Sequence, residues 1–170
     1  ISSRLTLEGP IKKGKSSFLV SGRRTYIDLL IAPLVAASTN GESTAGYFFY
    51  DFNAKANYDF NDNNKLFISG YFGKDKAYGR ENYGGDKNKF SIGWGNATGT
   101  ARWNHLFNEK LFANTSLIFS NYRFLIKNEE TFDGDKYTLR YYTGIQDISA
   151  KFDMDYRPGE KHIIKMGGQF

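Results

Sequence analysis

Apolar and polar side chains alternate at almost every residue from Tyr47 to Phe60, and this pattern restricts the possible folds more than any other feature. A two-residue period places the two sets of side chains on opposite faces of an extended strand. The apolar set is Phe48, Tyr50, Phe52, Ala54, Ala56, Tyr58 and Phe60, and the polar set is Asp51, Asn53, Lys55, Asn57 and Asp59. The same period returns over residues 96–107 and 147–156, where Phe152 and Met154 alternate with Lys151 and Asp153. We therefore predict strands with one apolar and one polar face.

Connections of two kinds separate these strands and the strand-rich segments 16–30, 65–74 and 111–127. Short polar connections are expected at 9–14, 61–64, 108–110 and 157–161, and long ones at 33–45, 75–89 and 128–136. This order predicts an all-β fold, an antiparallel up-and-down meander of about eight long strands. Soluble sandwiches turn every ~8–12 residues, whereas a strand plus its connection takes ~21 residues here. We therefore expect part of a transmembrane β-barrel, with the short turns periplasmic and the long connections extracellular.

Aromatic side chains lie near both ends of the segment 47–60, and the small Ala54 and Ala56 lie in its middle. The stretch from Tyr50 to Tyr58 covers ~20 Å of height in a tilted strand, close to the apolar band of a membrane barrel. A soluble sandwich with an aromatic core, for example a sugar-binding module, would instead place its bulk at strand centres. Phe48, Phe52, Ala54, Ala56, Phe152 and Met154 are thus expected to face lipid, and Asp51, Asn53, Lys55, Lys151 and Asp153 the lumen.

Several functional classes find no support in the residues. The longest apolar run, 29–37, contains Pro33 and is shorter than the ~20 residues of a membrane-spanning helix. The chain has no cysteine, and His105 and His162 lack a second ligand at metal-binding spacing. We predict no catalytic residues, no metal and no cofactor; an outer-membrane hydrolase would need a Ser/His or Asp/His pair. The net charge of +5 is modest and the lysines at 12, 13 and 15 share a turn, so nucleic-acid binding is not expected.

Residues 75–89 carry the ligand-binding hypothesis. This expected loop holds polar and aromatic side chains among glycines, a mixture that can stack on and hydrogen-bond a polar ligand. The candidates, together with one lumen residue from a neighbouring strand, are Tyr78, Arg80, Glu81, Asn82, Tyr83 and Asp51.

Four segments carry a resemblance to a known family: SRLTLEGPIKKGKSSFLVSGRRTY at 3–26, FYDFNAK at 49–55, LFISGYFG at 66–73 and WGNATGTARWNH at 94–105. They resemble the early barrel of TonB-dependent outer-membrane receptors of the Bacteroidetes type. The resemblance implies a Gram-negative outer-membrane location, a plug domain in the parent chain, energy supplied by TonB, and import of iron chelates, cobalamin, sugars or peptides. Residues 1–170 would then be part of the barrel without the plug. The apolar run 29–37 could contact the plug, another loop or a surface lipoprotein.

A second interpretation remains open at this point. Eight strands are enough to close a small barrel, which would serve as an outer-membrane anchor or adhesin.

Overall fold

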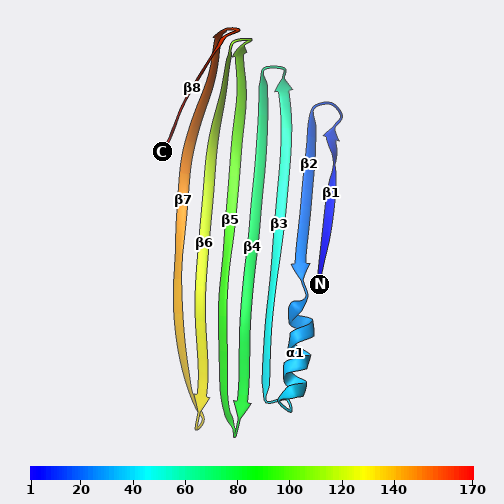
Figure 1. The fold of residues 1–170 in the computed structure, drawn as a ribbon, viewed down its shortest axis with the longest axis vertical. Helices are drawn as coiled ribbons and strands as arrows, with labels where there is room; N and C mark the ends of the chain where they lie inside the picture. Colours follow the sequence, from blue (N-terminus) through cyan, green and yellow to red (C-terminus); the bar gives the residue numbers. More distant parts are fainter.

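The computed structural model describes residues 1–170 as one sheet of eight strands with one helix (Figure 1). The elements are β1 (Ser2–Lys12), β2 (Ser16–Thr25), α1 (Ile27–Ser38), β3 (Ser43–Asn61), β4 (Asn64–Tyr83), β5 (Asp86–Asn108), β6 (Leu111–Phe132), β7 (Asp135–Gly159) and β8 (His162–Gln169). Each strand pairs antiparallel with the next, in the order β1 to β8. The predicted all-β antiparallel meander is confirmed.

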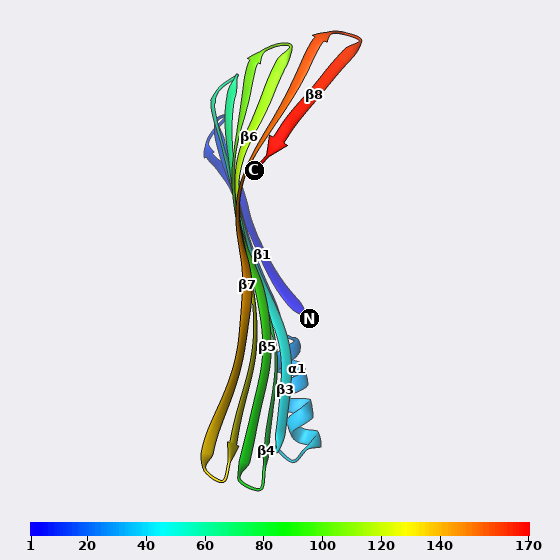
Figure 2. The same cartoon turned by 90° about the vertical axis from the view of Figure 1, so that its left-hand side faces the viewer.

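The sheet is a single twisted layer, and neither face is covered by a second layer of structure (Figure 2). Only 9 of the 170 residues are buried, and Ala113 is the only apolar one among them. Hydrophobic burial within this chain therefore does little to stabilise it. Its apolar side chains need contact with something outside the sheet.

The prediction of long loops at 75–89 and 128–136 is wrong, because both segments are hairpins of paired strands. β4 and β5 continue to a two-residue turn at Gly84 and Gly85, and β6 and β7 continue to a turn at Asp133 and Gly134. All four turn residues have positive φ, which matches the geometry of tight hairpins. The segments are polar, but pairing with a neighbouring strand satisfies their backbone groups, so they form sheet rather than loop.

The segment 27–38 forms the helix α1, whereas the sequence predicted strand to residue 30 followed by an apolar loop. Figure 1 shows α1 continuing the line of β2 along the part of β3 that β2 does not reach. At the start of α1, the Thr25 hydroxyl accepts a hydrogen bond from Phe49 N (2.9 Å), and at its end Thr39 accepts one from Ser43 N (3.0 Å). The helix thus covers an otherwise free strand edge. It is too short to span a membrane.

Direct cross-strand pairing assigns each side chain to one of two faces, because opposite residues of an antiparallel pair share a face. We name them the Phe52 face and the Asp51 face, after two neighbouring residues of β3. The register is continuous over most of β3 to β7, so the assignment carries across the sheet. Phe48, Ala54, Ala56, Phe152 and Met154 share the Phe52 face, and Asn53, Lys55, Lys151 and Asp153 share the Asp51 face. The predicted partition of these residues between two faces is confirmed.

Candidate functional site

An apolar band crosses the Phe52 face of all eight strands. Its members are Leu5, Leu7, Phe18, Val20, Phe52, Ala54, Ala56, Leu66, Ile68, Phe72, Ala97, Ala101, Leu117, Phe119, Ile148, Ala150, Phe152, Ile164 and Met166. Ile68, Leu117 and Ile148 are each more than half exposed, at 52%, 58% and 66%. A continuous apolar surface of this kind indicates contact with lipid or with another apolar surface.

Aromatic rings line the end of this band that lies near the β3–β4 and β5–β6 turns. The rings of Tyr58 and Phe60 are 4.9 Å apart, and His105 packs edge-on against Phe107 at 4.3 Å. The Asn64 side-chain oxygen accepts a hydrogen bond from Trp103 Nε1 (3.2 Å) and lies 2.7 Å from His105 Nδ1. Aromatic side chains whose ring nitrogen is hydrogen-bonded while the rest of the ring is apolar are typical of an aromatic girdle at a membrane interface.

Opposite the band, the Asp51 face is polar and carries paired charges. Arg23 binds Asp51 at 2.6 Å, Lys151 binds Asp153 at 3.0 Å, and Lys165 binds Asp155 at 3.3 Å. Four asparagines on this face have a buried amide oxygen without a partner in the sheet: Asn96, Asn104, Asn114 and Asn128. Unpaired polar atoms are costly in lipid, so this face requires water or polar protein beside it.

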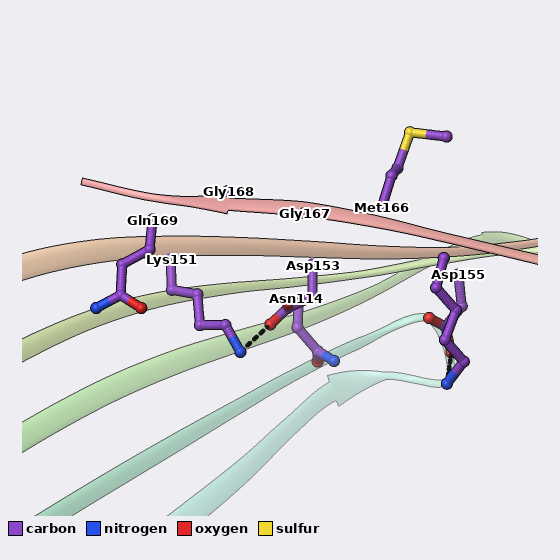
Figure 3. Close-up of a pocket in the computed structure, with 9 residues that line it drawn as sticks. Asn114, Lys151, Asp153, Asp155, Met166, Gly167, Gly168 and Gln169 are labelled. Carbon is purple, nitrogen blue, oxygen red and sulfur yellow. Dashed lines mark ion pairs between the residues drawn. The ribbon is translucent and has the colours of Figure 1, made fainter.

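A hollow of about 610 Å³ lies beside β6, β7 and β8, mainly on the Asp51 face. Figure 3 shows the ion pair of Lys151 with Asp153 along it. A second ion pair joins Lys165 to Asp155. Each lysine is already neutralised by a carboxylate, and β8 is the open edge of the sheet. The hollow is therefore a weak candidate for ligand binding.

The distribution of polarity reverses beyond one row of directly opposed residues. This boundary row is Tyr50, Lys74, Gly95, Arg123 and Gly144. From it the strands run on to the turns at 84–85 and 133–134, about nine residues or roughly 30 Å along the strand. In this part, which we call the extension, the Phe52 face is cationic and the Asp51 face is aromatic and acidic.

The aromatic part of the extension begins in the row Phe49, Asp75, Trp94 and Phe124 on the Asp51 face. Tyr47, in the next row, stacks on Trp94 with ring centroids 6.4 Å apart and donates a hydrogen bond from its hydroxyl to Asp75 Oδ1 at 2.6 Å. That hydrogen bond, followed by partial burial and the negative charge of Asp75, raises the pKa of Tyr47 to about 12. We call these five residues the aromatic wall. Ile92 and Ile126 extend it beyond Trp94 and Phe124.

The carboxylates of the extension follow the same division. Those on strand positions of the Asp51 face are Asp75, Glu81, Asp86, Glu130 and Asp135. The Phe52 face of these strands carries one carboxylate, Glu129, whose pKa is lowered by hydrogen bonds from Lys127 and then Lys136. The two faces of the extension thus differ in the sign of their charge.

The structure divides the six predicted ligand residues between the two faces. Asp51, Glu81 and Tyr83 lie on the Asp51 face, whereas Tyr78, Arg80 and Asn82 lie on the Phe52 face. They form no single cluster, because residues 75–89 are a paired hairpin and not a loop. The aromatic wall was not predicted. Its signal was present in β5, where apolar residues move from the odd positions 97–103 to the even positions 90–94.

No group of three or more histidine or acidic side chains is arranged to hold a metal ion.

No protein-family model and no curated protein matches this sequence. Among solved structures, the ferric yersiniabactin uptake receptor FyuA of Yersinia pestis is similar over 94% of this chain, with a TM-score of 0.56 and 7% identity. This chain spans 26% of the length of that receptor. The siderophore receptor PirA of Pseudomonas aeruginosa aligns with 98% of this chain over 40% of the length of PirA, at 10% identity. Its TM-score of 0.27 is too low to support an argument.

The likeness to the first receptor establishes the fold of this chain. It is an antiparallel meander with the same fold as part of that receptor. The predicted fold class is confirmed.

Proposed function

We propose that residues 1–170 form part of the barrel wall of a TonB-dependent receptor, of the Bacteroidetes type, that imports a nutrient across a Gram-negative outer membrane. The plug domain of the parent chain lies against the Asp51 face, and TonB supplies energy through that plug. The observation that carries the proposal is the apolar band on one continuous face of eight strands, opposite a polar face with unpaired amides. A barrel wall between lipid and a wet lumen requires this arrangement.

A complete small barrel is less well supported than a segment of a large one. Closure would require β1 to pair with β8, and the sheet instead ends with these two strands as its free edges. Unpaired edges in lipid are costly, so further strands on both sides fit the structure better.

The extension supports one orientation of the wall in the membrane. Connection length does not distinguish the two ends, because most turns at both ends have two residues. Strand length beyond the apolar band does distinguish them: in β3 to β7, at least nine residues remain at the Gly84 and Gly134 end, and two to seven at the Asn63 end. Outer-membrane barrels project further on the extracellular side. On intact cells, a cysteine at Lys76 should therefore react with an impermeant maleimide and one at Asn63 should not; the reverse pattern would invert the wall.

The aromatic wall suits an uncharged or cationic nutrient. Aromatic faces attract cations, and the carboxylates of the same face repel anions. Among the ligand classes of the family it resembles, sugars and basic peptides fit this surface better than anionic iron chelates.

Growth of a strain that lacks the gene for the full-length protein, called the deletion strain, tests the proposed import. Each nutrient class should be supplied in turn as the limiting source. We expect the deletion strain to lose growth on a sugar or a peptide, and a strain with inactivated TonB to lose growth on the same nutrient. Growth of the deletion strain on every class would contradict an uptake role, and a loss confined to an iron chelate would contradict the ligand assignment alone.

A further inference from the structure

Asp75 is a carboxylate without a counter-ion among the rings of the aromatic wall. Its neighbours in the same row are Phe49 on β3 and Trp94 on β5, and the Tyr47 hydroxyl donates a hydrogen bond to it at 2.6 Å. The residue is partly buried and takes part in none of the ion pairs of the chain. A negative charge is therefore held beside three aromatic rings with no positive charge to balance it.

The basic side chains nearest to this carboxylate are engaged elsewhere. Lys74 and Lys76 lie on the Phe52 face, and no lysine or arginine occupies a strand position on the opposite face of the extension in β3 to β7. Arg23 of β2 lies over the Phe49 ring at 4.7 Å, but its guanidinium already binds Asp51 at 2.6 Å. This contact shows that a ring of the wall does attract a cation. The remaining rings and the free carboxylate have no such partner within the chain.

The surroundings of the carboxylate leave it accessible. The carboxylate and the rings of Tyr47 and Trp94 are all partly exposed, so a small group can reach them from the Asp51 face. Toward the apolar band, the ring of Tyr71 folds over Gly73 and closes that side. Toward the hairpin turn, a Cβ added at Gly79 would meet nothing within 4 Å, so the surface is open there.

A carboxylate beside aromatic rings is suited to an organic cation. Ring faces attract a cation through their quadrupole, most strongly at tryptophan, and also contact the carbon atoms attached to its nitrogen. The carboxylate adds an ion pair, which is stronger where water is partly excluded. A metal ion fits less well, because it needs several oxygen ligands and no group of three acidic or histidine side chains is present. Alkylammonium and quaternary ammonium groups match both features of the site.

We propose that Asp75, Trp94 and Tyr47 bind an ammonium group of the imported nutrient. Asp75 is the counter-ion, and the two rings contact the carbon atoms around the nitrogen. This inference rests on the proposed function and deepens it, because it narrows the nutrient from uncharged or cationic to one that carries an organic cation. A lysine side chain of a peptide and a free quaternary amine share this chemistry, and binding experiments distinguish them.

Isothermal titration of the full-length protein in detergent with two pairs of probes tests the proposal. The first pair is choline and its uncharged analogue, in which a tert-butyl group replaces the trimethylammonium group. The second pair is lysine with both backbone ends blocked and the equally blocked norleucine, which lacks the amine. We expect at least one cation to bind about 10-fold more tightly than its uncharged counterpart. Preference for blocked lysine would assign the ammonium group to a peptide, and preference for choline to a free quaternary amine.

Two variants and two matched controls locate the binding. Asp75→Asn removes the charge but can still accept the hydrogen bond from Tyr47, and Trp94→Leu removes a ring. The charge control, Asp135→Asn, lies on the same face eight residues from the row of Asp75, or about 26 Å along the strands. The ring control, Trp103→Leu, changes the other tryptophan of the chain, on the Phe52 face. Circular dichroism should show the wild-type β-sheet content in all four.

We expect Asp75→Asn to weaken binding of the preferred cation about 10-fold and to leave binding of its uncharged counterpart unchanged. Trp94→Leu should weaken it about 5- to 30-fold, and both controls should stay within about twofold of wild type. Wild-type protein that binds each cation no more tightly than its counterpart, or binds neither, would overturn the proposal. An equal loss in Asp135→Asn would also overturn it, because the acidic face as a whole would then attract the cation.

The outcome for this site is separable from the outcome for uptake. Failure of both cations to bind preferentially, together with the expected growth defect of the deletion strain, would overturn the ammonium site and leave the proposed function standing. Preferential binding that depends on Asp75 and Trp94, together with growth of the deletion strain on every nutrient, would support the site and contradict the uptake role.

Discussion

Two regions of the same strands, the apolar band and the extension, have opposite polarity on each face. In the band, the Phe52 face is apolar and the Asp51 face is polar; in the extension, the Phe52 face is cationic and the Asp51 face is aromatic. The backbone pairing does not change between them, since the register passes the boundary row without a bulge. The difference shows that the surroundings at each height determine which face is apolar.

Each arrangement has its own physical cause. A side chain in the band that points away from the lumen meets hydrocarbon, where charge is costly. Ten residues further along the same strand, the same direction meets water and headgroups, where lysine and arginine are favourable. Most apolar side chains of the extension, among them Trp94, Ile92 and Ile126, lie on the Asp51 face instead. The same strand therefore presents an apolar face to hydrocarbon at one height and a charged face to water and headgroups at another.

Arginine substitution on the Phe52 face should give the largest contrast between the regions. Ala54→Arg lies in the middle of the band and should lower the free energy of unfolding by ~2–4 kcal/mol, because the charge would enter the bilayer midplane. Thr138→Arg lies on the same face in the extension, opposite Glu129, and should cost almost nothing. Urea titrations in lipid vesicles measure both.

A second control tests the face and not the height. Asn53→Arg, one residue before Ala54, points to the Asp51 face and should also cost little. Equal costs for Ala54→Arg and Asn53→Arg would refute the assignment of the two faces.

The reversal also explains where sequence reasoning succeeded and failed. The strand centres at 47–60, 96–107 and 147–156 were predicted correctly, because alternation stays in one phase within the band. Beyond the boundary row the apolar side chains move from one parity of position to the other, for example from Ala97 to Trp94. A prediction that follows a single parity therefore ends the strand at this point. Gly84-Gly85 and Asp133-Gly134 are themselves signals for tight hairpins, so the sequence did indicate where these strands turn.

The helix α1 and the predicted ligand residues were harder to place. The start of α1 has no capping side chain and Pro33 lies inside it, so local signals did not favour a helix. Its position along the free edge of β3 is a tertiary effect. Tyr78 and Glu81 were grouped by closeness in sequence, but a strand sends residues of opposite parity to opposite faces. The aromatic wall joins residues from four strands, and only the register brings them together.

A pair of glycines in β5 should give a smaller contrast. A Cβ added at Gly95, in the boundary row, would lie 2.7 Å from the carbonyl oxygen of Gly73, whereas one at Gly99, within the band, would meet nothing within 4 Å. Gly95→Ala should therefore lower the free energy of unfolding by about 1–3 kcal/mol through strain between paired strands. Gly99→Ala should be close to neutral in the same lipid titration. If both variants were neutral, the close strand approach at the boundary row would be disproved.

Titration of Tyr47 should give the smallest effect and reports on the aromatic wall alone. The hydrogen bond to Asp75 raises the pKa of Tyr47 to about 12, above the ordinary value of 10, by favouring the neutral phenol. A raised pKa means that the contribution of this group to stability is present below pH 10 and is lost as the pH rises from 10 toward 12. The phenolate absorbance of wild type minus that of Tyr47→Phe should therefore rise with a midpoint near 12. Asp75→Asn should move that midpoint toward 10, because it removes the negative charge that opposes ionisation and offers the phenolate an amide N–H donor. A midpoint near 10 in the wild-type protein would show that Tyr47 and Asp75 do not meet on this face, and the aromatic wall would lose the contact that joins β3 to β4.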